Sequence, residues 1–388
     1  MGGMLRHLNS FVLLLAVAPT AFAQNWRIQT SGMDTNLRGV SAAWTDIPGK
    51  TPSPVVWASG SNGVVLRSMD DGKNWKRLRV EGGETLDFRG VRALDQNTAY
   101  LMSSGEGEKS RIYKTTDGGA TWILQYTDKR KEFFLDAIAC ETETKCFALG
   151  DPMDGKFLLL ETHDGEHWAR LPTDQLPAAL PGEGAFAASN SVLAIDEGDD
   201  VFFATGGGER ARVFYSPNNG QTWTWVDTPI HAGNAAAGVF SIEAKEGKIL
   251  VAVGGDYKRP EISEKVAAYS ENKGETWTLA TNQPGGYRSA VASVDGQLFV
   301  AVGPNGTDIS MDAGKTWKNS DPLSLNAISV LDIFDTWAVG AKGTIAKFQN
   351  PKKYEAKREN IEFSICPKMP GSRQLASNAT SLSTPGTL

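Results

Sequence analysis

Short apolar segments separated by polar, glycine-rich turns run through most of the chain. Seven segments of small and aliphatic residues end at or next to a glycine, and they read VVWASG, AYLMSSG, CFALGD, VFFATGG, LVAVGG, LFVAVG and TWAVG. Each follows a segment that opens LRGVSA at Leu37, FRGVRA at Phe88, FLDAIA at Phe134, FAASNS at Phe186, FSIEA at Phe240, YRSAVA at Tyr287 or LNAISV at Leu325. Runs of this length between turn residues are typical of β-strands. The pattern therefore predicts seven successive units that each open with two strands.

A second motif recurs inside six of these units and ends in a tryptophan, as in Ser68-Met-Asp-Asp-Gly-Lys-Asn-Trp75. Its copies end at Trp75, Trp122, Trp168, Trp223, Trp277 and Trp317, 40 to 55 residues apart. An Asp or Asn oxygen accepts hydrogen bonds from turn amides, and glycine adopts the positive φ that a turn requires. We interpret the motif as a hairpin turn with a structural role for Asp70, Gly72, Asp117, Gly119, Asn218, Gly220, Asn272, Gly274, Asp312 and Gly314, and with His163 at the Asp position of the third copy.

This period matches one four-stranded blade of a β-propeller. We predict an all-β fold, a seven-bladed β-propeller of four-stranded antiparallel blades, over residues 24–349. The seventh unit lacks the tryptophan turn, whereas Asn25-Trp26-Arg27-Ile28 looks like an isolated last strand. We expect residues 25–31 to complete the last blade, because closing the ring removes two exposed sheet edges.

The two ends of the chain differ from the repeats. Residues 1–23 contain Arg6, a short apolar run from Phe11 to Ala18, and the small residues Ala21 and Ala23, which together indicate a secretory signal peptide. We expect cleavage near Ala23 and export to the periplasm or the medium, with no membrane span in the mature chain. Residues 350–388 begin with a charged run and end in Ser, Thr, Pro and Gly, which predicts a mostly disordered tail.

Composition narrows the classes of ligand. The net charge of −6 gives no support for a nucleic-acid partner. The histidines have no zinc-ligand spacing, and the glycine-rich stretch 205–210 lies between two predicted strands, so we expect neither a metal nor a cofactor. Three cysteines are too few for a disulfide scaffold, but Cys140 and Cys146 flank a short predicted hairpin and are expected to form one disulfide bond.

The repeated turn is the Asp-box, or bacterial neuraminidase repeat. On its six copies, the openings LRGV and FRGV, and the stretches Leu180-Pro-Gly-Glu-Gly-Ala-Phe186 and Val253-Gly-Gly-Asp-Tyr257, residues 25–348 resemble the photosystem II stability/assembly factor family and its non-photosynthetic bacterial relatives. The resemblance implies a seven-bladed propeller that acts as an assembly chaperone without catalysis. Sialidases share the turn but have six blades and an F-R-I-P signature, which this sequence lacks.

Candidate binding residues follow from the geometry of a propeller, in which the first strand of each blade lines the central channel. The strand starts supply Arg38, Arg89, Asp136, Phe186, Phe240, Arg288 and Asn326, and the loops between second and third strands add Asp151, Asp154, Glu209, Arg210, Asp256, Lys258 and Arg259. We expect Arg38, Arg89 and Arg288, which occupy equivalent ring positions, to form one patch at one end of the channel. Such a patch suits a carboxylate or phosphate, because guanidinium groups bind these anions bidentately. Alternatively, these arginines pair with neighbouring acids or carbonyls and only solvate the channel.

The favoured function is therefore a monomeric, exported protein-binding or assembly module whose channel face takes a protein partner or an acidic or sugar ligand. One alternative is a sialidase-like exo-glycosidase, in which Glu183 activates Tyr287 as the nucleophile and Asp151 serves as acid/base. A further alternative is a carbohydrate-binding propeller without turnover.

Overall fold

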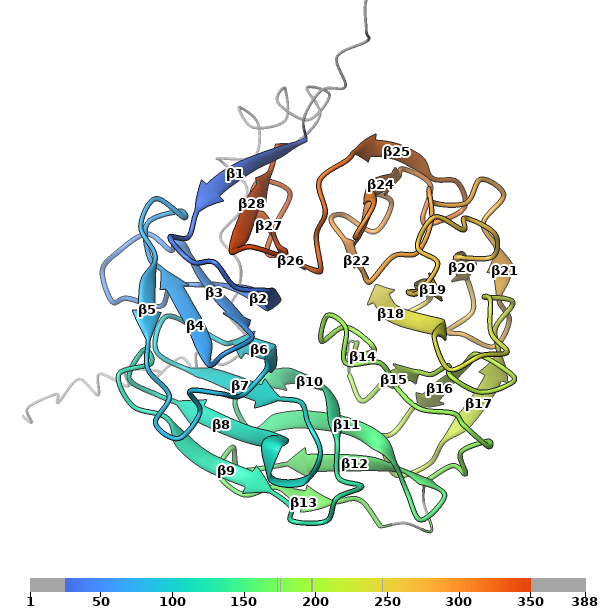
Figure 1. Cartoon of the computed structure of the whole chain (residues 1–388), viewed down its shortest axis with the longest axis horizontal. Helices are drawn as coiled ribbons and strands as arrows, with labels where there is room; N and C mark the ends of the chain where they lie inside the picture. The colour runs from blue at the N-terminus through green and yellow to red at the C-terminus, as the bar shows by residue number, and fades with distance from the viewer. Residues whose placement is uncertain (1–24, 173, 175, 197, 246, 350–388) are drawn as a thin grey trace, which may run out of the picture. The chain divides into compact units, whose positions relative to one another are not determined.

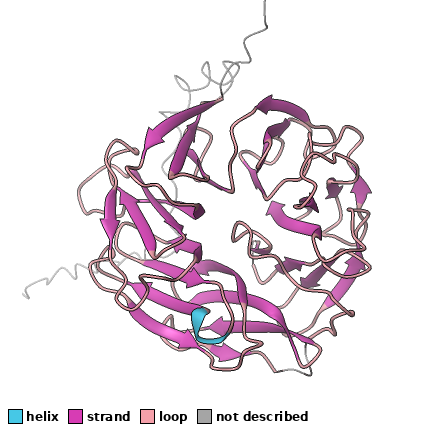
Figure 2. Cartoon of the chain, in the orientation of Figure 1, coloured by secondary structure: helices cyan, strands magenta, loops and turns pink. Residues whose placement is uncertain are grey.

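A closed ring of β-sheets forms the described part of the chain. The computed structural model describes residues 25–172, 174, 176–196, 198–245 and 247–349. Within these residues, 28 strands form seven four-stranded antiparallel sheets around a common axis (Figure 1). One short 3-10 turn, η1 (Gly107–Lys109), interrupts an otherwise all-β structure (Figure 2). The predicted seven-bladed propeller is confirmed, whereas the expected signal peptide and the expected disordered tail lie outside the described residues.

The first three blades follow chain order from the inside of the ring to its rim. They contain β2 (Leu37–Trp44), β3 (Pro54–Gly60), β4 (Val64–Ser68) and β5 (Lys76–Leu78); β6 (Phe88–Ala93), β7 (Ala99–Ser103), β8 (Arg111–Thr115) and β9 (Ile123–Thr127); and β10 (Leu135–Thr142), β11 (Lys145–Met153), β12 (Lys156–Thr162) and β13 (Ala169–Arg170).

The next three blades repeat this order. They contain β14 (Leu193–Ile195), β15 (Val201–Ala204), β16 (Arg212–Ser216) and β17 (Thr224–Asp227); β18 (Ala237–Lys245), β19 (Ile249–Asp256), β20 (Ala267–Ser270) and β21 (Thr278–Leu279); and β22 (Ala290–Ser293), β23 (Phe299–Gly303), β24 (Gly306–Ser310) and β25 (Lys318–Asp321).

The seventh blade joins the two ends of the propeller. It contains β26 (Ala327–Val330), β27 (Thr336–Val339), β28 (Thr344–Phe348) and, as its outer strand, β1 (Trp26–Thr30). Trp26 lies opposite Phe348, with ring centroids 5.0 Å apart, and its indole N–H donates to Thr307 of the sixth blade at 2.9 Å. The predicted closure by the N-terminal strand is confirmed.

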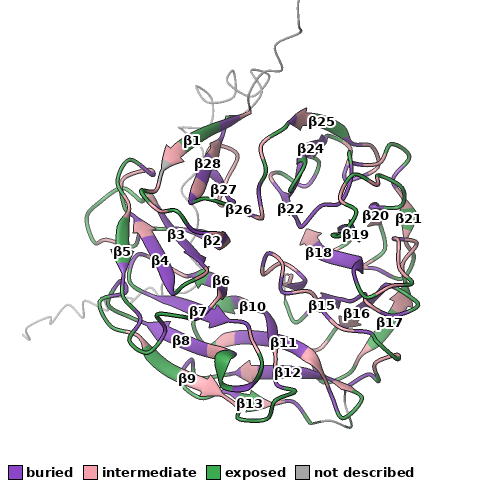
Figure 3. Ribbon diagram, in the orientation of Figure 1, coloured by how far each residue is buried: buried purple, intermediate pink, exposed green. Residues whose placement is uncertain are grey.

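The core lies between neighbouring blades. Second and third strands are buried, whereas the outer strands expose much of their surface (Figure 3). Several turn tryptophans pack edge-on against an aromatic residue in the second strand of the preceding blade: Trp75 on Trp337, Trp122 on Trp57 and Trp168 on Tyr100, with centroids 5.8–6.3 Å apart. Each such tryptophan therefore joins two blades, which explains why it recurs with the period of the blade.

The polar residues of the tryptophan turns are bonded within the turns themselves. In the second blade Asp117 accepts hydrogen bonds from the amide and hydroxyl of Thr121, and these bonds lower its pKa to about 2. Asn218 and Asn272 accept from the equivalent threonines. The expectation for His163 was wrong, because the third turn is one residue shorter and Asp164 accepts the turn amides there. Asp or Asn therefore has a structural role in these turns.

One predicted strand is replaced by a different structure. FAASNS, residues 186–191, is not a strand, and the innermost strand of the fourth blade starts only at Leu193. We call residues 186–191 the axial segment. It hydrogen-bonds to the first and second blades through Ala187, to the third through Asn190, to the fifth through Ser191 and to the sixth through Ser189. Because these blades lie all around the ring, the axial segment crosses the axis, where Figure 1 shows the loop before β14.

Candidate functional site

The innermost strands place a set of side chains at one end of the axis. We call this end the inlet face; it is where first strands begin and second strands end, as at Leu37 and Gly60 in the first blade. In four blades the first strand is bulged near its start, and the extra residue is Arg38, Arg89, Asp136 or Phe240. A bulge leaves its extra residue out of the strand pairing and re-aims the side chain. The bulges thus explain why these four predicted side chains depart from the regular strand pairing at the inlet face.

Arg38 and Arg89 meet on the axial segment. Both guanidinium groups donate to the carbonyl oxygen of Ala187, at 3.3 and 3.0 Å. Arg89 also donates to Asp87 at 2.7 Å, whereas the buried Nε of Arg38 has no partner among the described residues. Burial, and then the charge of Arg89, lowers the pKa of Arg38. Arg38 therefore combines a charge with unused hydrogen-bonding capacity.

Arg288 does not join this pair, which corrects the expected three-arginine patch. Its side chain is fully buried and forms an ion pair with Asp308 of β24, with Nε 2.6 Å from the carboxylate. A second guanidinium nitrogen donates to the Tyr287 carbonyl at 2.9 Å and to Asn305. Because the innermost strand of this blade starts only at Ala290, Arg288 lacks a bulge like those of Arg38 and Arg89. Its role is structural.

The third blade brings two carboxyl groups together. Asp136 is 1% exposed, and neither of its carboxylate oxygens has a hydrogen-bond partner among the described residues. Asp151 lies next to the bulge that holds Asp136, because its backbone amide donates to the Phe134 carbonyl at 3.0 Å. Burial, and then the charge of Asp151, raises the pKa of Asp136 well above its usual value, and burial raises that of Asp151 to about 6. The two carboxyl groups therefore make an acidic site beside Arg89.

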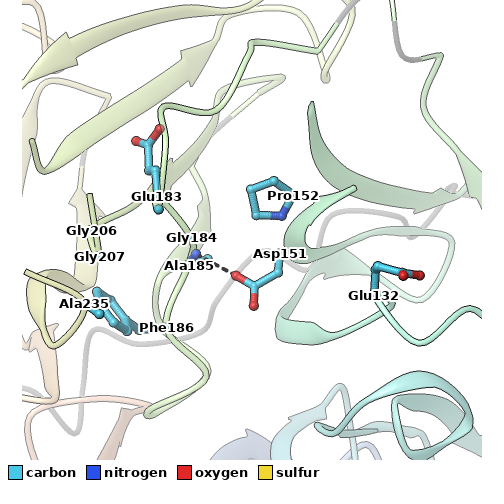
Figure 4. Close-up of a pocket in the computed structure, with 11 residues that line it drawn as sticks. Glu132, Asp151, Pro152, Glu183, Gly184, Ala185, Phe186, Gly206, Gly207 and Ala235 are labelled. Atoms are coloured by element: carbon cyan, nitrogen blue, oxygen red, sulfur yellow. Dashed lines mark hydrogen bonds between the residues drawn. The ribbon is translucent and has the colours of Figure 1, made fainter. Parts of the chain in front are cut away.

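Asp151 also lines a pocket between the third and fourth blades. The pocket has a volume of about 440 Å³ and is lined by Glu132, Asp151, Pro152, residues 182–186, Gly206, Gly207 and Ala235. Asp151 projects into it and accepts a hydrogen bond from the Ala185 amide at 3.2 Å (Figure 4). Phe186 forms part of the wall and stacks on Phe240, with ring centroids 3.8 Å apart. The pocket thus combines carboxyl groups with an aromatic surface.

The residues of the alternative glycosidase site are not arranged for that reaction. Glu183 is buried and forms an ion pair with Arg212, and it also accepts the hydroxyl of Thr205 at 2.6 Å. Its oxygens are thus occupied by donors. Tyr287 is buried against Phe240, with centroids 4.7 Å apart, and burial raises the pKa of its hydroxyl. A carboxylate held by Arg212 does not activate Tyr287 as a nucleophile.

The other predicted residues are spread over the inlet face. The side-chain amide of Asn326 donates to Asn36 and to the Leu37 carbonyl, both at 2.7 Å, and so links the seventh and first blades. Asp256 pairs with Arg259 and accepts the Lys258 amide, which makes a local turn. Arg210 pairs with Asp227 at 2.8 Å near the rim. Asp154 and Glu209 are exposed.

Sequence reasoning missed the axial segment, the acceptor Asp87 and the buried Arg212–Glu183 pair. A signal for the pair was present, because Arg212 begins a mainly apolar strand and a buried charge needs a partner. Among the described residues, no group of three or more His, Cys, Asp or Glu side chains is arranged to hold a metal ion. The disulfide bond between Cys140 and Cys146 is present, at facing positions of β10 and β11.

Comparisons with known proteins agree with this fold. No family model matches the chain. A segment of 72 residues is 32% identical to the photosystem II assembly lipoprotein Ycf48 of Synechococcus sp. (strain CC9902), and the match spans 19% of this chain and 20% of that protein.

Solved structures match over most of the chain at low sequence identity. Ycf48 from Cyanidioschyzon merolae has a TM-score of 0.61 at 16% identity, covering 84% of this chain and 99% of that one. Ycf48 bound to a D1 peptide has a TM-score of 0.58 at 14% identity, covering 85% and 98%, and the Dos1 propeller has 0.51 at 11%, covering 84% and 95%. Residues 25–349 thus form a propeller that resembles the photosystem II assembly factor Ycf48.

Proposed function

We propose that this propeller is an exported, non-enzymatic protein-binding module that acts in the assembly of other proteins, with its partner bound on the inlet face around Arg38 and Arg89. The observation that carries the proposal is the convergence of these two arginines beside an unpartnered carboxyl group and a pocket. Buried polar groups that are not satisfied within a chain call for an explanation, and a bound ligand is one such explanation.

Three further points support the proposal. A propeller of the same fold has been solved with a peptide bound, the D1 peptide on Ycf48. The opposite face carries the tryptophan turns, whose carboxylates bond within their own turns. The leader-like sequence of residues 1–23 favours export. A partner with a carboxylate suits Arg38 and Arg89, because guanidinium groups form charge-assisted hydrogen bonds to carboxylates.

The test is chemical crosslinking in cells of the source organism, with partners identified by mass spectrometry. We expect the Arg38→Ala/Arg89→Ala variant to lose the crosslinked partner that wild type captures. The matched control is Lys76→Ala/Arg77→Ala, which removes the same charge from exposed positions on the outer strand β5. Equal capture by both variants contradicts a binding role for the arginine pair.

The same purified protein distinguishes the alternatives. Hydrolysis of a fluorogenic sugar panel that is lost on Tyr287→Phe supports the glycosidase. Binding to a glycan array without hydrolysis supports the carbohydrate-binding propeller. Neither result is expected from a protein-binding module.

A further inference from the structure

All charged residues that line the pocket between the third and fourth blades are acidic. Glu132 and Asp151 contribute carboxyl groups, and the third acid on its wall, Glu183, is neutralised by Arg212. No lysine or arginine is among the residues that line the pocket. Figure 4 shows Asp151 between Glu132 and the backbone of Ala185. A cationic group that enters the pocket therefore meets unneutralised carboxyl groups.

Asp136 adds a buried acceptor with no internal use. Its two oxygens have no hydrogen-bond partner among the described residues, although its side chain is almost completely buried. Arg89 is the cation that acts on it, but Arg89 donates to Asp87 and to the Ala187 carbonyl instead. An unpaired buried carboxyl group costs several kcal/mol unless a ligand satisfies it or a proton neutralises it. Asp136 is thus held next to Asp151 without a structural partner.

The local backbone holds Asp151 in place. A Cβ atom at Gly184 would lie only 2.5 Å from the Asp151 carboxylate, so glycine is needed for the approach that lets the Ala185 amide donate to Asp151. The hydrogen bond from the Ala185 amide uses one oxygen of the Asp151 carboxylate. Pro152, Ala185 and Phe186 supply an apolar wall around it. This combination suits a cation on an aliphatic stem, because the stem packs on apolar surface while the charged head meets the carboxylate.

Building on the proposed function, we propose that this pocket binds the guanidinium group of an arginine side chain presented by the protein partner. The guanidinium donates to Asp151, and its methylene groups pack on Phe186. Asp136 does not line the pocket, but it lies next to Asp151 and adds a second carboxyl group near the cation. Arginine suits two neighbouring carboxyl groups better than lysine, because its planar fork offers five N–H donors. The adjacent Arg38 and Arg89 take an acidic group of the same partner segment.

The probe for this proposal is N-acetyl-L-arginine amide, with the isosteric but uncharged N-acetyl-L-citrulline amide as its match. Isothermal titration of the mature protein is expected to give saturable binding of the arginine amide alone. Asp151→Asn is expected to weaken this binding at least ten-fold, and Asp136→Asn, outside the pocket lining, is expected to weaken it by a smaller factor. The matched control is Asp46→Asn, an exposed aspartate in the loop between β2 and β3, which is expected to leave binding unchanged.

Stability provides a second, independent measurement. Asp136→Asn keeps the shape of the side chain and removes a buried ionisable group that has no hydrogen-bond partner among the described residues, so the urea midpoint of the free protein is expected to stay equal or to rise. A structural role for Asp136 predicts a lower midpoint, and that result overturns the proposal. Equal binding of both probes, or wild-type binding by Asp136→Asn and Asp151→Asn, overturns it as well.

The outcome is separable from the fate of the proposed function. If crosslinking requires Arg38 and Arg89 but the arginine amide does not bind, the pocket proposal alone fails. If the arginine amide binds but no protein partner is captured, the pocket chemistry stands and the assembly role fails.

Discussion

Closure of the ring by Trp26 makes a quantitative prediction about stability. The side chain is 3% exposed, packs on Phe348 and donates to Thr307 in the neighbouring blade. A buried tryptophan removes about 150–250 Å² from water, which at about 25 cal/mol/Å² gives an upper bound of about 4–6 kcal/mol. Truncation of buried tryptophans costs about 3–5 kcal/mol. We therefore expect Trp26→Ala to lower the free energy of unfolding by about 3–5 kcal/mol.

Two further substitutions separate the contributions at this strand. Trp26→Phe keeps the aromatic contact with Phe348 but loses the indole hydrogen bond and some volume, so we expect a loss of about 1–2 kcal/mol. Ile28→Ala is the matched control, since Ile28 lies on the same strand, two residues away, but is 62% exposed. It leaves the strand pairing intact and is expected to cost less than about 1 kcal/mol.

Urea unfolding of the purified protein, followed by far-UV circular dichroism, measures all three variants. Hydrogen exchange of the β28 amides reports whether β1 has detached locally. The reasoning is refuted if Trp26→Ala costs no more than Ile28→Ala and leaves β28 exchange unchanged. That result would mean that the ring does not depend on its borrowed outer strand.

Three other predictions follow from the buried pairs and turns. Arg288→Met leaves the buried Asp308 carboxylate unpaired and is expected to cost about 3–5 kcal/mol in denaturant unfolding, most of which Arg288→Met/Asp308→Leu recovers. Asp117 has a folded pKa of about 2, below its unfolded value, so its negative charge stabilises the folded protein above about pH 4. The difference in unfolding free energy between wild type and Asp117→Asn is therefore expected to shrink as pH falls and to close near pH 2 in unfolding curves. Loss of the Cys140–Cys146 bond by double serine substitution is expected to cost about 2 kcal/mol, since the closed loop is short; no change in the urea midpoint would contradict this.

The architecture was predictable from sequence because its determinants are local. The tryptophan turn encodes its own hydrogen bonds within a few residues, and it recurs in six of the seven blades, so its spacing identifies the fold. The isolated Trp26 strand was recognisable for the same reason. In the third turn the hydroxyl residue moves by one position, and Asp164 takes the place that alignment assigned to His163.

The site was only partly predictable because it depends on register between strands. Arg38 and Arg288 occupy equivalent places in their repeats, but one sits at a bulge and the other precedes its strand. The Arg288 side chain instead pairs with Asp308, in the third strand of the same blade. Asp308 lies in the short strand GTDIS beside other polar residues, so the sequence alone did not mark it as the partner of a buried arginine.

The axial segment was predicted as a strand because its sequence is compatible with both a strand and a loop. Its sequence, FAASNS, has a strand-like length and position, but small polar residues pack poorly as a central strand and readily hydrogen-bond to backbone groups. Asn190 shows the result, since its side chain bonds to both the amide and the carbonyl of Ile138. That contact requires Gly90, where a Cβ atom would lie 2.4 Å from the Asn190 oxygen. Such long-range complementarity is visible only in three dimensions.

The inlet face therefore contains two kinds of charged group with different consequences. Glu183 with Arg212, and Arg288 with Asp308, are closed pairs whose partners lie within single blades, and they hold the local backbone. Arg38 and Asp136 are open, because each has buried polar atoms without a partner. An unpartnered buried polar group costs stability. The closed pairs show that this fold can supply partners for buried charges. Arg38 contacts the axial segment at Ala187, and Asp136 lies next to Asp151 of the pocket wall. This placement favours ligand binding rather than ring stability as their role.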